Sequence, residues 1–91
     1  MKLTQKVKIS KRVFAQNIDD EMVLLDTTTQ NYFGLDGVGS VMWQTIEEKI
    51  VIQDILDTLL EYYEVEEDIL KRDLFIFIDS LVNSQLLEVV E

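Results

Sequence analysis

The chain contains no cysteine and no histidine among its 91 residues. Their absence excludes disulfide bonds, thiolate nucleophiles, imidazole bases and nearly all zinc, haem and iron–sulfur ligation. No serine, threonine or lysine has a recognisable partner base in the sequence, which argues against nucleophilic catalysis. We therefore expect a protein that is not an enzyme and that holds no metal ion and no cofactor.

Long hydrophobic runs are also missing. The longest is Leu74–Ile78, far short of the ~20 residues that cross a bilayer. Residues 1–8 are charged and alternating, and they lack the apolar stretch that a signal peptide requires. These features predict a cytoplasmic protein with no membrane partner, and the absence of cysteine fits a reducing compartment.

Proline is absent too, and no repeat or low-complexity segment interrupts the chain. With 91 residues there is room for one hydrophobic core, since two cores would each be too small to be stable. Hydrophobic residues make up 47% of the sequence and charged residues 29%, a balance typical of globular proteins. We expect a single domain over residues 1–91.

Positive charge is scarce and unevenly distributed. Eight Lys and Arg residues oppose eighteen Asp and Glu residues, which gives a net charge of −10. Residues 1–16 carry five of the basic residues and no acidic one, so the remainder of the chain has a charge of −15. An acidic body repels phosphate backbones and favours a cationic partner, although acidity can also serve only to keep a small protein soluble.

Alternating polar and apolar residues predict strands in the first third of the chain. Lys6–Ser10 is expected to form the first strand, and a polar stretch ending in Asn17–Asp20 separates it from the second, Glu21–Asp26. Residues 27–30 are typical of a turn, and Asn31–Leu35 of a third strand. The second and third strands therefore predict a hairpin.

Helical periodicity predicts three helices in the rest of the chain. Asp36 can cap a first helix over about residues 37–48. Apolar residues from Ile52 to Tyr63 recur at helical spacing and predict a second helix. A third begins in the acidic segment Glu64–Asp68, where carboxylates meet the positive end of the helix dipole. A short strand is expected near residues 86–90.

The third predicted helix carries more apolar surface than one core face needs. Leu70, Leu74 and Ile78 belong to its core stripe, together with Phe77 and Leu81. Four further apolar residues lie off that stripe: Ile69, Phe75, Ile76 and Val82. Either this helix is buried on two sides or part of its surface awaits a partner.

Three patterns that could carry chemistry have plainer explanations. Gly34, Gly37 and Gly39 match neither a P-loop nor a dinucleotide-binding fingerprint, and fit a tight strand-to-helix turn better. The acidic runs Asp19–Glu21 and Glu66–Asp68 lack the ligand spacing of a calcium loop. Three strands followed by three helices is an order shared with winged-helix proteins, many of which bind DNA. Because acidic residues begin the helix that would read the duplex, we expect no nucleic-acid partner.

One set of residues is distinctive for its order and spacing. It comprises Val23-Leu24-Leu25-Asp26, Tyr32-Phe33-Gly34-Leu35-Asp36, Gly39, Trp43, Asp73, Phe77-Ile78, Leu81 and Leu86-Leu87. This pattern, within about residues 7–88, resembles that of the PqqD-like family, also called recognition elements for RiPPs, which are ribosomally made and modified peptides. Two positions depart from the family pattern, because Asp36 replaces a common Asn and Gln85 replaces a common Gly.

The resemblance implies an α+β fold of the winged helix-turn-helix type, a three-stranded antiparallel sheet followed by three helices. It implies non-catalytic binding of a precursor leader peptide by strand addition, for delivery to a leader protease or another RiPP-modifying enzyme. A stand-alone recognition protein of about this length resembles those of lasso-peptide biosynthesis. The leader peptides of lasso precursors are often basic. The alternatives are a PqqD-type peptide chaperone for a radical enzyme in pyrroloquinoline quinone biosynthesis, and an acidic regulatory protein–protein module.

The same resemblance implies a peptide-binding groove between the strand at residues 31–35 and the third helix. Asn31, Tyr32, Phe33 and Gly34 are expected to supply mainly backbone hydrogen bonds. Leader side chains would enter pockets lined by Leu24, Tyr32, Ile69, Ile76 and Phe77, with Asp73 and Ser80 as polar contacts. The residues of the helix are three or four positions apart and share one face, although Tyr32, Ile76 and Phe77 could instead be plain core.

Overall fold

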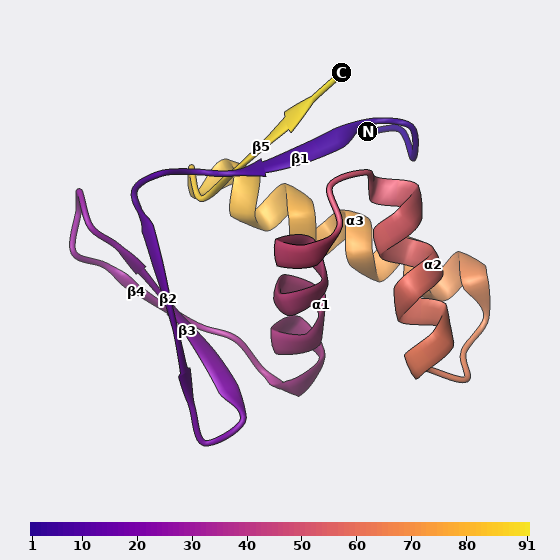
Figure 1. The fold of residues 1–91 in the computed structure, drawn as a ribbon, viewed down its shortest axis with the longest axis horizontal. Coiled ribbons are helices and arrows are strands. Elements are labelled where there is room, and N and C mark those ends of the chain that lie inside the picture. Colours follow the sequence, from indigo (N-terminus) through magenta and orange to yellow (C-terminus); the bar gives the residue numbers. More distant parts are fainter.

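A computed structural model describes residues 1–91, and Figure 1 shows their arrangement. The elements are β1 (Lys6–Ile9), β2 (Val13–Ile18), β3 (Glu21–Asp26), β4 (Tyr32–Gly34), α1 (Gly37–Glu48), α2 (Ile52–Tyr62), α3 (Glu67–Asn83) and β5 (Leu87–Val90). A three-stranded antiparallel sheet is followed by three helices, so the expected α+β class is confirmed. No helix combines the length and the apolar character needed to span a membrane.

Strands β2, β3 and β4 form this sheet in that order, and β1 pairs with β5 in a separate two-stranded sheet. The expected strand at residues 6–10 is therefore real, but its partner comes from the other end of the chain. The expectation of a polar connection before residue 21 is wrong, because Val13–Ile18 forms β2. As an edge strand, β2 buries little, and so its sequence lacks a strong hydrophobic alternation.

The sheet has one face towards the helices and one towards solvent. Met22, Leu24 and Asp26 of β3 are buried, whereas Val23 and Leu25 between them are only half-buried. Since directly paired residues of neighbouring strands share a face, the side chain of Phe33 points inward with Leu24. Tyr32 points outward with Leu25 and is 70% exposed.

The helices begin and end near the expected residues because their local signals are strong. The Gly39 N–H donates to Asp36 Oδ1 at 2.7 Å, which confirms Asp36 as the cap of α1. The core cluster combines residues of all three helices with residues of β1, β3 and β5. Fully buried hydrophobic residues of the helices are Trp43, Ile52, Ile55, Leu56, Leu59, Leu74 and Ile78.

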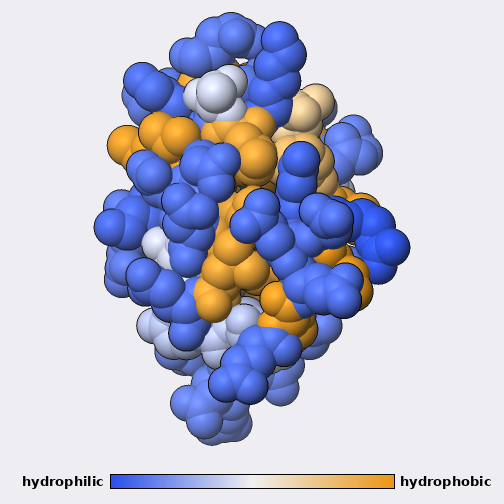
Figure 2. Space-filling model, turned by 90° about the vertical axis from the view of Figure 1, so that its right-hand side faces the viewer, coloured by the Kyte–Doolittle hydropathy of each residue, from blue (hydrophilic) through white to orange (hydrophobic).

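The surplus apolar surface of α3 is real. Ile69 is 42% exposed and Ile76 is 61% exposed, while Leu74 and Ile78 of the core stripe are fully buried. The sheet lies on the opposite side of α1 from α2 in Figure 1. Figure 2 shows the α2 side of the molecule, where a band of hydrophobic side chains is bordered by hydrophilic ones. Apolar side chains are therefore also exposed on this side of the molecule.

Candidate functional site

Strand β4 has a free edge, because β3 is its only neighbour in the sheet. The Asp26 N–H donates to the Asn31 carbonyl at 2.9 Å, and the Leu35 N–H donates to the Met22 carbonyl at 2.9 Å. Hydrogen-bonded and non-bonded pairs alternate along an antiparallel ladder. Residues 31, 33 and 35 therefore direct their backbone groups at β3.

The backbone groups at the free edge belong to Tyr32 and Gly34, the two residues between those bonded positions. Two of the four residues expected to pair with a peptide are thus oriented for it. Asn31 and Phe33 are not, since both are bonded positions of the β3–β4 ladder. An edge with unpaired N–H and C=O groups is a template for one additional strand.

A groove lies between α3 and the start of α1. It has a volume of about 500 Å³, within the range of ligand-binding clefts. Four of the residues expected in the site line it together: Asp73, Ile76, Phe77 and Ser80. They stand at positions three and four apart on α3, so the expected helical face exists. The opposite wall consists of Asp36, Val38, Gly39 and Met42.

The α1 wall was not expected from the sequence, although Gly39 belongs to the distinctive pattern. A Cβ atom on Gly39 would lie 3.3 Å from Phe77 Cε1 and 3.2 Å from Asp36 Oδ1. The glycine therefore lets α1 approach the Phe77 ring closely, at the floor of the groove. The spacing of the glycines indicated a tight turn, but not which side chain would pack against it.

Three other expected residues lie differently. Leu24 is fully buried in the core, so the expectation that it lines an open pocket is wrong. Its side chain faces the helices, and Ala15 of β2 and Phe33 of β4 are paired with it on either side. Ile69 is exposed but is not among the residues that line the groove between α1 and α3. Tyr32 lies beside the free edge but on the outer face of the sheet.

The charge of the groove is negative. Asp36 and Asp73 are both among its lining residues, and no lysine or arginine is. Arg72 Nε lies 3.8 Å from Asp73 Oδ1, but both side chains are exposed, which makes this pair weak. A lysine or arginine of a bound peptide would meet two carboxylates here.

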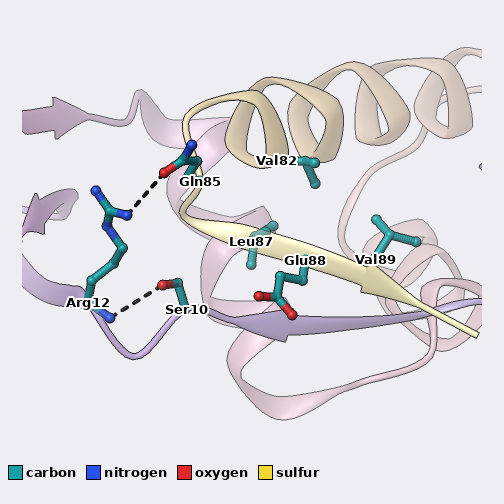
Figure 3. A pocket seen from close by; sticks show the side chains of 7 residues that line it. All are labelled: Ser10, Arg12, Val82, Gln85, Leu87, Glu88 and Val89. Atoms are coloured by element: carbon teal, nitrogen blue, oxygen red, sulfur yellow. Dashed lines mark hydrogen bonds between the residues drawn. The ribbon is translucent and has the colours of Figure 1, made fainter.

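A second cavity lies at the C-terminal end of α3, beside β5 (Figure 3). Its Arg12 side chain is already engaged, because Nη1 donates to Gln85 Oε1 at 3.1 Å and Nε donates to Asp26 Oδ1 at 2.9 Å. Together with the backbone N–H groups of Thr28 and Thr29, this guanidinium holds the pKa of Asp26 well below its usual range. These bonds connect the start of β2 with β3 and with the end of α3, and they stabilise the fold.

Gln85 explains one departure from the family pattern. Its φ angle is 64°, in the left-handed region that glycine adopts without cost. The residue directly follows the C-cap of α3, where helices commonly end in that conformation. Gln85 adopts this strained backbone conformation, and its Oε1 accepts a hydrogen bond from Arg12 Nη1.

Comparison with known proteins supports the same family. The family model for coenzyme PQQ synthesis protein D (PqqD) matches residues 21–87. Among solved structures, TbiB1 in complex with the TbiA(beta) leader peptide is 44% identical over 89% of this chain and 94% of that one, with a TM-score of 0.84. Lasso peptide synthetase B1 complexed with the leader peptide shares the fold at 23% identity, over 90% of this chain and 96% of that one, with a TM-score of 0.81. No curated protein matches. With a family match that covers most of its length, the chain belongs to the PqqD family.

Proposed function

We propose that this protein binds the leader segment of a ribosomally made precursor peptide as an additional strand on β4. The bound leader is delivered to a leader protease or another modifying enzyme of lasso-peptide biosynthesis. Residues 1–91 act as one cytoplasmic recognition domain, without catalysis and without a cofactor. The relative TbiB1, 44% identical, is known in complex with a leader peptide.

One observation carries this proposal: the free edge of β4 and the groove beside α3 adjoin one another. Asp36 lies two residues after the end of β4 and lines the groove, so a strand added at Tyr32 and Gly34 runs alongside it. Alternate side chains of an added strand point to opposite faces of the sheet. One set therefore enters the groove against Ile76 and Phe77, and the other set lies beside Tyr32 on the outer face.

The site residues of the proposal follow from this geometry. Tyr32 and Gly34 supply backbone hydrogen bonds, and Ile76 and Phe77 supply apolar contact. Asp73, with Asp36 opposite, favours a basic leader residue, and Ser80 offers a hydroxyl at the end of the groove. Strand addition of this kind uses the backbone for affinity and the side-chain pockets for specificity.

The test is to remove one backbone donor without changing the fold. Gly34→Pro replaces the outward N–H by a ring carbon, whereas Gly34→Ala keeps that N–H. A Cβ on Gly34 has no neighbour within 4 Å, and its φ angle is not positive, so alanine is accommodated. Proline is tolerated on the open side of an edge strand.

The TbiA(beta) leader peptide, fluorescently labelled, serves as the probe in an anisotropy titration. We expect Gly34→Ala to bind as the wild type does, and Gly34→Pro to bind about tenfold more weakly, the scale of one lost hydrogen bond with an unpaired partner. Equal affinity of the two variants would refute strand addition at β4.

A role as a peptide chaperone in pyrroloquinoline quinone synthesis is the second candidate, because the matching family model is described by that pathway. The two candidates differ in the peptide bound and not in the groove. Competition between the TbiA(beta) leader and a pyrroloquinoline quinone precursor peptide for the labelled site separates them. Displacement only by the second peptide would favour the chaperone role.

A further inference from the structure

The outer edge of β2 is also free, on the side of the sheet opposite to β4. The Thr27 N–H donates to the Arg12 carbonyl at 2.8 Å, which makes residues 12, 14, 16 and 18 the bonded positions of the β2–β3 ladder. The backbone groups of Ala15 and Asn17 therefore point away from β3. The Val13 N–H also lies on this side but donates to the Ser10 carbonyl at 3.2 Å.

Two large apolar side chains flank this edge. Phe14 is 58% exposed and Ile18 is 47% exposed. Both lie on the outer face of the sheet, with Gln16 between them, because side chains alternate along the strand. A strand edge with exposed apolar residues is a pairing surface unless it is protected, and β2 carries neither a proline nor a lysine within its span.

We propose that β2 pairs with β2 of a second copy of this chain, antiparallel and around a two-fold axis at Gln16. In this register the backbone groups of Ala15 bond to those of Asn17 in the second copy, and the reverse. The two three-stranded sheets join into one continuous sheet, and each β4 stays free at an outer edge. The proposal does not depend on what β4 binds.

The register is chosen by three features of the same strand. Only Ala15 and Asn17 have both backbone groups free, and this register pairs them with each other. It also places Phe14 opposite Ile18 of the second copy, so that the exposed apolar residues cover one another. Shifting the pairing by two residues would leave Phe14 and Ile18 opposite polar residues.

Charge favours a second copy over an unrelated partner. Lys11 precedes β2 and the acidic turn Asp19–Glu21 follows it, and these ends are exposed. An antiparallel pair brings the basic end of one strand to the acidic end of the other, with Lys11 near Asp19 in the turn of the second copy. The net charge of −10 per chain opposes association, so the dimer is weak and needs high concentration.

Sedimentation velocity from about 10 μM to about 1 mM tests the pairing, over the range of weak interfaces. Ala15→Pro removes one edge N–H, and Phe14→Asp removes an apolar contact twice per dimer. Each should raise the dimer dissociation constant on the order of tenfold, because each substitution removes one cross-strand contact from each of the two copies. Ile50→Asp is the matched control, because Ile50 is 61% exposed but lies outside β2.

A charge exchange identifies the register. Lys11→Glu alone and Asp19→Lys alone should each weaken the dimer, and the double variant should restore it. Anisotropy titration with the TbiA(beta) leader peptide checks that all variants keep the same affinity at β4. A wild-type chain that stays monomeric up to 1 mM would overturn the proposal, and so would a dimer that Ala15→Pro leaves intact.

Discussion

Replacement of Ile76 by serine measures how much the α3 wall of the groove contributes to peptide binding. Complete burial of an isoleucine side chain stabilises by about 1.5–3 kcal/mol. Ile76 is 61% exposed in the free protein, so a bound peptide can still bury somewhat more than half of it. The expected loss is about 1–2 kcal/mol of binding free energy, which corresponds to about 5- to 30-fold in Kd.

The same exposure predicts that folding is unaffected. A side chain that is mostly in water changes the free energy of unfolding by less than about 0.5 kcal/mol when replaced, and serine and isoleucine have similar helix propensities. Urea unfolding followed by the fluorescence of Trp43, which is 1% exposed, checks this point. Trp43 is the only tryptophan in the chain.

Ile50→Ser is the matched control for the binding measurement. Ile50 has the same 61% exposure as Ile76 but does not line the groove. Anisotropy titration with the labelled TbiA(beta) leader should show weaker binding for Ile76→Ser alone. Wild-type affinity in a folded Ile76→Ser variant, or an equal loss in Ile50→Ser, would refute the assignment of this groove.

Further predictions concern charge, packing and pH. Asp73→Lys should weaken binding of a lysine-containing leader by about 1–3 kcal/mol. Titrations at rising salt should show the affinity of the wild type falling, because salt screens the attraction between charges. An affinity that does not change with salt would contradict the electrostatic contribution. Gly39→Val should press on the Phe77 ring, lower the free energy of unfolding by about 1–3 kcal/mol and weaken leader binding, whereas Gly39→Ala needs a shift of only a few tenths of an ångström. Because Arg12 lowers the pKa of Asp26 below its ordinary value of 3.8, the stability from this pair is complete above that pH and is lost as pH falls below it. Urea midpoints between pH 7 and pH 3 should therefore fall more steeply for the wild type than for Asp26→Asn, and parallel curves would exclude this contribution.

The helices could be predicted from the sequence because their signals are local. The cap at Asp36 and the apolar spacing of residues 52–63 act within a few turns of one helix, so α1 and α2 begin where expected. The expected face of α3 also exists, and its Asp73, Ile76, Phe77 and Ser80 line one groove. The distinctive order of core and turn residues indicated the family without any structure.

The strand pairing and the position of each side chain in the sheet depended on tertiary structure. β2 is an edge strand with little buried surface, so its own sequence carries no strong strand signal. Its strand conformation depends on pairing with β3. β1 pairs with β5 across nearly the whole chain, a contact that local periodicity cannot reveal. The same limit explains Leu24, whose burial depends on what the neighbouring strands and helices cover.

Sequence by itself determined the absence of cysteine and histidine, the acidic body, the three helices and the apolar surplus on α3. Tertiary structure alone decided that Tyr32 and Gly34, and not Asn31 and Phe33, present backbone groups at the edge of β4. It also decided that α1 supplies the second wall of the groove, at Asp36 and Gly39. The physical reason is that hydrogen-bond direction follows the ladder register, and a one-residue shift in register would reverse it.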